Sequence, residues 1–431
     1  MDGLPQLPGT FATRPVWLQV GTLLDGTSAS PLYDAHIVYD ADAIRYVGAA
    51  DHPPPRELVR PGQTAPDVEA ADSTLMPGLI EAHAHLFLEG GELNAERRAA
   101  HLMQRPPDLF DAARARLDRL VHLGIIGVRD AGDKDGVGLS LSKLYASGPG
   151  VRPLMPYVES PGADIHHQGR YGGFMAEPLE NYPSPQACVD ARVAAGADRI
   201  KIITTGIVNF KAGAVAPEPQ MTADEIAQLV AAAKGHQRQT FAHASGETGI
   251  DRALAGGVDS IEHGLFIRED QLARMRDQNI AWVPTFAPLQ AQVDHAAILG
   301  WDAATVSHLQ RLLDQHAARL VQAHALGVPI IAGSDAGSYG VMHGLGLLYE
   351  LELMERAGLP APAVLNAATG VSANRLAYKE RFGRISPGWK SRFILTRHPP
   401  LATVLNLLLP KLVVFDGAVY ETEDTFEPKG L

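Results

Sequence analysis

The sequence has very little cysteine, few aromatic residues and no long apolar run. Of its 431 residues one is cysteine, Cys188, and 6% are aromatic. A single cysteine cannot form a disulfide within the chain, and it excludes a metal site built from several thiolates. The longest apolar candidate, residues 404–415, is interrupted by Asn406, Pro410 and Lys411. It therefore falls short of the roughly 18 apolar residues that a membrane span requires, and no membrane segment is expected.

Basic charge is also scarce, because 37 lysines and arginines face 49 aspartates and glutamates, for a net charge of −12. An acidic chain without a dense basic cluster is a poor candidate for binding nucleic acid or an anionic membrane. The first residues lack the basic and apolar segments of a secretory signal. As the chain stands this predicts a cytoplasmic protein, whereas a leader removed ahead of Met1 would make it periplasmic or secreted.

The order of predicted elements indicates an α/β fold. From residue 75 to about 378, short apolar strands alternate with segments of helical period. The strand candidates are residues 75–85, 125–130, 154–159, 200–204, 240–243, 260–263, 281–286 and 329–334. Eight strands alternating with helices over this length favour a parallel (β/α)₈ TIM barrel over a doubly wound sheet.

Short β runs occur at both ends of the chain. They lie between residues 16 and 77 and again at 392–395, 411–415 and 418–420. We expect residues 1–74 and 386–431 to form one small β-sandwich, and residues 75–385 to form the barrel. The alternative is two unrelated β appendages.

Residue types that bind metals follow the predicted strands. Catalytic groups of a barrel lie at the carboxyl ends of its strands. The residues at these ends are His83 and His85 on the first, Lys201, His243 and His263 on the fourth to sixth, and Asp335 after the eighth. Each alone is more often structural, but together they predict a site for Zn²⁺ or a related divalent ion. A buried lysine charge is costly unless it is paired or chemically changed.

This order resembles the amidohydrolase superfamily. The stretch Pro77–His85 is close to its first-strand signature, and Gly333–Gly337 resembles its eighth-strand signature. The stretch Ser260–Gly264 and the Lys201 strand look most like the Xaa-Pro dipeptidase-like subgroup, which includes ochratoxin-hydrolysing amidohydrolases. One departure is the stretch 388–393, where the family usually has Gly-x-x-Ala-Asp-Leu. It concerns the terminal β region and leaves the metal ligands untouched.

The resemblance implies two divalent metal ions, zinc in the first place, and a homo-oligomer, an octamer as in relatives. By the same resemblance His83, His85 and Asp335 bind one ion, and His243 and His263 bind the other. Lys201 would be carbamylated by CO₂ and bridge both. The carbamate would replace an unwanted buried cation with an anionic oxygen ligand.

Several loop residues are further candidates. His166 and His167 lie in a glycine-rich loop where the subgroup has a histidine that polarises the substrate carbonyl, and a solvated role is the alternative for either. His343 follows Asp335 and is a candidate pocket residue. Arg170 and Lys211 are loop cations that would meet a substrate carboxylate, or else remain solvated. The apolar wall would come from Phe174, Phe210, Phe286 and Met342.

The functional hypothesis is hydrolysis of an amide in N-acyl amino acids or dipeptides, with ochratoxin A as a plausible small-molecule substrate. Asp335 would take a proton from the attacking water and return it to the departing amine. A deaminase or cyclic-amide hydrolase is the alternative within enzymes, and it would usually use one metal without Lys201. An inactive scaffold relative is the second alternative, but such a protein should have lost at least one ligand.

Overall fold

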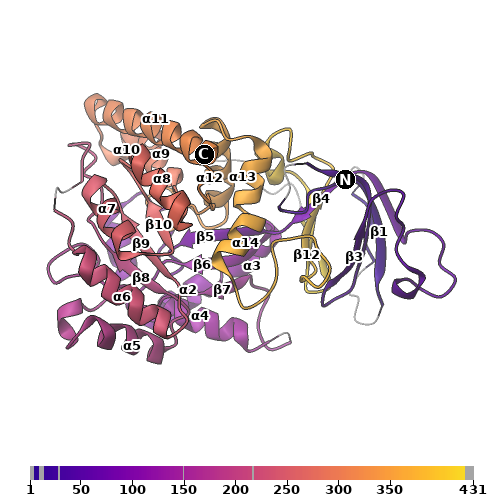
Figure 1. Ribbon diagram of the computed structural model, residues 1–431, viewed down its shortest axis with the longest axis horizontal. Coiled ribbons are helices and arrows are strands. Elements are labelled where there is room, and N and C mark those ends of the chain that lie inside the picture. Colours follow the sequence, from indigo (N-terminus) through magenta and orange to yellow (C-terminus); the bar gives the residue numbers. More distant parts are fainter. Residues whose placement is uncertain (1–3, 9–13, 28–29, 149, 216–217, 423–431) are drawn as a thin grey trace. The chain divides into compact units, whose positions relative to one another are not determined.

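The computed structural model combines helices and strands throughout (Figure 1). It describes residues 4–8, 14–27, 30–148, 150–215 and 218–422. The chain divides into two compact units, each assembled from segments far apart in sequence. The first is Met1–Ile80 with Asp118–Gly127 and Pro360–Leu431, and the second is Glu81–Leu117 with Val128–Leu359. The predicted α/β class is confirmed at this level.

The first unit contains a seven-stranded sheet drawn from both ends of the chain. Its hydrogen-bonded order is β14 (Ala418–Thr422), β13 (Lys411–Phe415), β12 (Arg392–Thr396), β4 (Val68–Pro77), β1 (Val16–Leu23), β2 (Leu32–Tyr39) and β3 (Ile44–Gly48). The two ends meet where β12 pairs antiparallel with β4, with Ile394 opposite Met76. The predicted sandwich and its limits at residues 74 and 386 stay predictions.

Alternating apolar side chains form the core of this sheet. On β1 the buried residues Val16, Leu18 and Val20 point to one face, as the two-residue period of a strand requires. Across the sheet they join Tyr39 and Phe393, whose rings meet edge to face with centroids 4.9 Å apart. The alternating apolar residues of these strands therefore pack together in one core.

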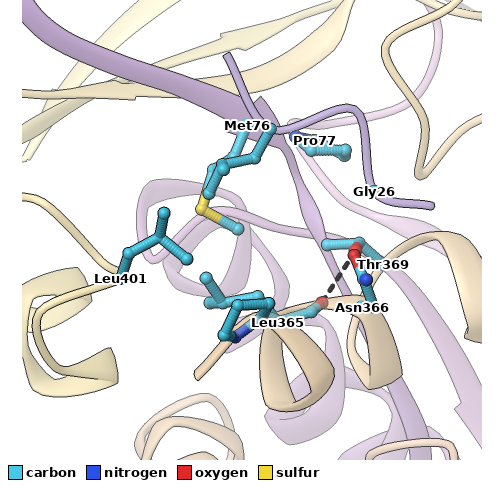
Figure 2. A pocket seen from close by; sticks show the side chains of 9 residues that line it. Gly26, Met76, Pro77, Leu365, Asn366, Thr369 and Leu401 are labelled. Atoms are coloured by element: carbon cyan, nitrogen blue, oxygen red, sulfur yellow. Dashed lines mark hydrogen bonds between the residues drawn. The ribbon is translucent and has the colours of Figure 1, made fainter. Parts of the chain in front are cut away.

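A small apolar pocket also lies within the first unit, and Figure 2 shows its lining. Met76, Leu365 and Leu401 contribute side chains, and Thr369 Oγ1 donates a hydrogen bond to the carbonyl of Leu365 at 2.7 Å. Its volume of about 10 Å³ is room for about one water molecule. The pocket is too small for an organic ligand.

The second unit contains a parallel sheet in which strands and helices alternate. Its strands are β8 (Ile200–Ile203), β9 (Thr240–Ala244), β10 (Ser260–His263) and β11 (Ala281–Val283), in that order across the sheet. The connecting helices are α6 (Ala223–Gly235), α7 (Glu247–Gly256) and α8 (Glu269–Gln278). Parallel strands need such crossovers, and their continuous apolar character follows from burial on both faces. A capping box between Thr222 and Glu225 begins α6.

Three further strands form a second sheet, β5 (Leu79–Ala84), β6 (Ile125–Asp130) and β7 (Tyr157–Glu159). A parallel bridge between Ile165, which follows β7, and Ile202 of β8 joins the segments of the two sheets. The first predicted strand, residues 75–85, is divided between β4 and β5 in the structure.

The segment expected to be the eighth strand, residues 329–334, is less regular than predicted. Within the described residues it forms isolated parallel bridges, Ile330 with Trp282 of β11 and Ala336 with Ala84 of β5. Its backbone passes so close to β5 that a Cβ on Gly333 would lie 2.8 Å from the backbone nitrogen of His83. Glycine is required there. This close approach brings the end of the segment next to His83 on β5 and to His85, which follows that strand.

The described part of the chain contains eleven further α-helices. They are α1 (Ala95–Leu102), α2 (Pro106–Arg114), α3 (Leu117–His122), α4 (Val137–Ala146), α5 (Pro185–Ala195), α9 (Phe286–Asp294), α10 (Ala296–Leu299), α11 (Ala303–Leu326), α12 (Leu345–Arg356), α13 (Ala361–Ala367) and α14 (Gly370–Leu376). The longest, α11, is capped by the Asp302 side chain and ends at Gly327. Among the described residues, no helix has both the length and the apolar character to span a membrane.

Candidate metal centre and active site

Two histidines and an aspartate from distant parts of the sequence converge in the second unit. His83 lies on β5 and His85 directly follows it, so their side chains emerge on the same side. Asp335 Oδ1 lies 3.7 Å from His83 Nε2 and 3.6 Å from His85 Nε2. One ligand atom from each lies within 4.8 Å of the others, near enough to hold one metal ion. The structure thus brings together three of the predicted ligands.

The buried carboxylate of Glu81 fixes the two segments that carry these ligands. It accepts hydrogen bonds from the backbone nitrogens of His83 at 3.0 Å and Ser334 at 2.9 Å. It also accepts one from Ser334 Oγ at 2.5 Å. Burial raises the pKa of Glu81 to about 7, against these hydrogen bonds, which lower it. Because one side chain binds both segments, Glu81 sets the position of His83 relative to Asp335.

A second buried carboxylate, Glu262 on β10, orients His83. It accepts hydrogen bonds from His83 Nδ1 at 2.6 Å, Arg129 Nη2 at 2.8 Å and Ser260 Oγ at 2.6 Å. With Nδ1 as donor, the lone pair of His83 lies on Nε2, which is buried and without a hydrogen-bond partner. Buried polar atoms normally have partners, and metal-binding histidines commonly donate their other nitrogen to a carboxylate. His83 Nε2 therefore fits a metal ligand.

The other histidines are oriented in the same way. His85 Nδ1 and His243 Nε2 each donate to the backbone carbonyl of a loop glycine, at 3.2 Å and 3.3 Å, which leaves the second nitrogen of each ring as an acceptor. His263 Nδ1 bonds to Thr285 Oγ1 at 2.8 Å. The ring of His263 lies 5.1 Å from that of His83 and 4.6 Å from that of His243. The four imidazoles thus form one group.

Burial decides the charge of this group. It lowers the pKa of His85 and His243 to about 3, and that of His83 and His263 well below the usual range. The imidazoles are therefore neutral at neutral pH, which is the form that binds a metal ion. Burial also lowers the pKa of Lys201 to about 8, although the charge of Glu262 raises it.

Asp335 has an uncommon backbone conformation at the end of its segment. Its φ is +53°, in the left-handed region that aspartate tolerates better than most residues. Burial raises the pKa of its carboxyl to about 7, and the charge of Lys201 opposes this rise. Ser338 Oγ donates a hydrogen bond to Oδ2 at 3.1 Å. The carboxyl therefore presents Oδ1 to the histidines while Oδ2 is held by the loop.

A cavity of about 440 Å³ opens onto these residues. Lys201, His85, His243, His263 and Asp335 line it. Most of the remaining wall is apolar and includes Leu88, Leu102, Phe174, Met175, Ile203, Ile207, Val208, Phe210, Leu265, Pro288 and Leu289. Such a mixture of apolar wall and few polar groups is typical of a small-molecule site. Five of the six predicted metal ligands thus line one cavity, and the sixth, His83, contacts Asp335.

The two predicted loop histidines lie elsewhere. His167 pairs with Glu180 at 2.8 Å and Glu225 at 3.3 Å. His166 is buried, and its Nδ1 lies 3.6 Å from Asp164. Neither is among the described residues that line the cavity, whereas Tyr171 of the same loop does line it. The assisting role of His166 or His167 stays a prediction.

The predicted carboxylate-binding residues also lie outside the described cavity lining. Arg170 donates to the carbonyl of Glu218 at 2.8 Å, and Lys211 is exposed. His343 donates from Nε2 to the backbone carbonyl of His85 at 3.0 Å, so it supports a candidate ligand from behind. The predicted contact of Arg170, Lys211 and His343 with the substrate stays a prediction. Of the four apolar residues expected in the wall, Phe174 and Phe210 line the cavity, whereas Phe286 and Met342 do not.

Comparison with known proteins identifies the family. A model described as the amidohydrolase family matches residues 74–420. This chain belongs to the amidohydrolase family. The family expected from the signatures at Pro77–His85 and Gly333–Gly337 is therefore confirmed.

Relatives of this amidohydrolase include proteins of the expected subgroup. The chain is 24% identical over 443 residues to ochratoxinase of Aspergillus niger, covering 94% of this chain and 86% of that protein. It is 26% identical over 294 residues to an uncharacterised protein of Mycobacterium tuberculosis, covering 68% and 72%. Among solved structures, a Xaa-Pro dipeptidase with methionine bound in its active site has a TM-score of 0.78 at 25% identity, covering 94% of this chain and 100% of that chain. The structure of A. niger ochratoxinase has a TM-score of 0.77 at 21% identity, covering 95% and 96%.

Sequence reasoning missed the residues that position the amidohydrolase ligands. Glu81 and Glu262 lie inside short apolar strands and are fully enclosed in the structure, as is Arg129. A charged residue within a buried strand is costly unless it is paired. The position of Glu81 two residues before His83 was therefore a signal in the sequence, whereas nothing local links Glu262 to His83, which lies 179 residues away.

Proposed function

We propose that this amidohydrolase is a metal-dependent hydrolase of the amide bond in N-acyl amino acids or dipeptides, and that it releases a free amino acid. The observation that carries the proposal is a group of neutral imidazoles and one aspartate beside an apolar cavity. Imidazole and carboxylate are the ligands of catalytic zinc sites. Family membership and the relatives named ochratoxinase and Xaa-Pro dipeptidase support the same reaction class.

We propose that residues 75–385, which carry the candidate metal centre, form a (β/α)₈ barrel. The isolated bridge after β7 connects that segment to β8, and the bridges at either end of residues 330–336 connect β11 and β5. These isolated bridges support the proposal that the eight segments close into one ring. A barrel would gather the ends of its strands at one face, which accounts for the convergence of the ligands.

We propose two divalent metal ions, zinc in the first place, at this centre. His83, His85 and Asp335 would hold one, His243 and His263 the other, and a carbamylated Lys201 would bridge them. The partnerless Nε2 of His83 and the complete burial of Lys201 in a group of neutral rings support this assignment. When bound, such ions acidify water and polarise a carbonyl oxygen.

The side chains of this chain supply orientation and proton transfer. Glu81 and Glu262 hold the ligand histidines in place through the hydrogen bonds described above. Asp335 takes the proton from the attacking water and returns it to the nitrogen of the leaving amine. Tyr171 lines the cavity, and the centre of its ring lies 5.3 Å from that of His243.

The apolar wall favours a substrate with a bulky apolar group next to the amide. Ochratoxin A, dipeptides ending in proline or phenylalanine, and N-acyl amino acids belong to this class. One methylene changes discrimination by only about 1–3 kcal/mol, so several of them should be cleaved.

The test is a release assay on the zinc-loaded protein. N-benzoyl-phenylalanine, alanyl-proline and ochratoxin A would be incubated in parallel, and the freed amino acid would be quantified. We expect release from at least one, and release at least about a hundredfold slower from Asp335→Asn prepared in the same way, which controls for contaminating peptidases. Equal release by that variant, or turnover of cyclic amides alone, would contradict the proposal.

Metal content separates the alternatives. Two ions per chain support the proposed centre, one supports a deaminase or cyclic-amide hydrolase, and none supports an inactive scaffold. The measurement is elemental analysis of protein purified without chelators, with Lys201→Ala beside it.

A further inference from the structure

One cation lines the cavity without belonging to the proposed metal centre. Arg98 lies on α1, and Ala95, Arg98, Ala99 and Leu102 all line the cavity. These positions follow the spacing of one helix face, so α1 presents this face to the cavity. The Asn94 side chain accepts a hydrogen bond from the helix backbone and begins α1. Because α1 begins at Asn94, Arg98 falls on the face of the helix that lines the cavity.

The contacts of Arg98 leave its charge without a carboxylate partner. Its Nη2 donates to the carbonyl of Gly337 at 2.7 Å and its Nη1 to the carbonyl of Glu89 at 3.0 Å. Its guanidinium carbon lies 4.1 Å from the centre of the Tyr339 ring. Among the described residues, no carboxylate oxygen lies within 4.0 Å of its nitrogens, although, against the lowering by burial, the charges of Asp335 and Glu89 act to raise its pKa. A guanidinium has five N–H donors, so donors remain beyond those that bind the two carbonyls and the Tyr339 side chain.

We propose that Arg98 binds the free carboxylate of the substrate, an inference that rests on the proposed function. Arginine recognises carboxylates with parallel hydrogen bonds, which are strongest where water is excluded. Lys201, the other cation among the described lining residues, stands among the metal ligands. Arg170 and Lys211, the cations expected from the sequence, lie outside that lining. Arg98 is therefore the cation that we assign to the substrate carboxylate.

The position of Arg98 also sets the direction of the substrate. It is bonded to Gly337 and stacked on Tyr339, in the loop that begins at Asp335. In an N-acyl amino acid the carboxylate is one carbon away from the amide nitrogen. A carboxylate on Arg98 therefore places that nitrogen on the Asp335 side of the cavity, where the departing amine must receive its proton. The acyl group is left to the apolar wall formed by residues such as Phe210 and Leu289.

The experiment compares N-benzoyl-phenylalanine with its C-terminal amide on wild type, Arg98→Met and Arg98→Lys. Wild type should prefer the acid. Arg98→Met keeps the length of the side chain without its charge, and it should reduce the ratio of kcat/KM for acid over amide about tenfold to a hundredfold. The loss should fall on KM for the acid and leave the amide unchanged. The ratio for Arg98→Lys should lie between those of wild type and Arg98→Met.

Arg116→Met is the matched control. Arg116 is also half-buried, and it also donates to a backbone carbonyl, that of Leu88 at 2.5 Å, but it is not among the described lining residues. Its substitution should leave the ratio unchanged. An equal loss on acid and amide in Arg98→Met would show that Arg98 merely clamps its loop, and would overturn the inference. A change of ratio in Arg170→Met or Lys211→Met instead would transfer the role to that residue. If wild type cleaves neither, the same comparison is made with ochratoxin A and its C-terminal amide, and failure of wild type on every substrate of the release assay would contradict the proposed function itself.

Discussion

Replacement of Glu262 by glutamine tests the argument about ligand orientation. The carboxylate accepts hydrogen bonds from His83, Arg129 and Ser260, and all four side chains are buried. Glutamine keeps the shape but removes the negative charge opposite Arg129. Loss of one partner of a buried ion pair costs about 3–5 kcal/mol of stability. Its amide can also donate toward His83, which would disturb the protonation of Nδ1 and with it the free lone pair on Nε2.

Two measurements follow from this reasoning. Urea unfolding of the metal-free protein should show the loss of about 3–5 kcal/mol. Zinc affinity, measured by competition with a chelator well below the unfolding transition, should fall about 10–100-fold. Glu218→Gln is the control, because Glu218 is exposed and its ion pair with Arg252 lies at the surface. Wild-type zinc affinity in Glu262→Gln would refute the claim that this carboxylate prepares His83 for a metal.

Three further predictions concern the centre and its surroundings. Lys201→Ala should lose metal and activity together, with partial recovery in added acetate, and full metal content in elemental analysis would refute the bridge. Asp335→Asn should keep its melting temperature but lose about 10²–10⁴ in kcat, and near-normal turnover would exclude its role in proton transfer. Burial lowers the pKa of His316 from 6.5 to about 4, so below pH 6.5 the unfolded chain takes up a proton that the folded chain does not. His316 should therefore contribute roughly 3 kcal/mol to the loss of stability between pH 6.5 and 4, in addition to the other buried histidines, and His316→Gln should make the slope shallower by that amount in urea unfolding. An unchanged slope in that variant would contradict the assignment to His316.

The sequence by itself predicted most of the elements and the candidate ligands. β6, β10 and β13 have the bounds that the sequence predicted, because each is a short segment of β-type residues that ends at a loop or turn. The candidate ligands could be named because they follow one another at the predicted strand ends, although each residue alone is more often structural. The two family signatures, Pro77–His85 and Gly333–Gly337, are likewise short continuous stretches that can be recognised in the sequence alone.

The tertiary structure decided which of the loop residues meet the cavity. His166, His167, Arg170, Lys211 and His343 all follow the right strands, yet none is among the described lining residues, because a loop's path depends on contacts from other segments. Arg98 and Tyr171 line the cavity although neither stands at a strand end.

The same holds for the residues that orient the ligands. Glu81 binds Ser334 and Glu262 binds His83, and each pair is far apart in sequence. No periodicity or spacing reports such a pairing, since it depends on how the strands lie side by side in the folded chain. The sequence thus supplied the candidate ligands, and only the fold revealed what holds them in place and which arginine lines the cavity beside them.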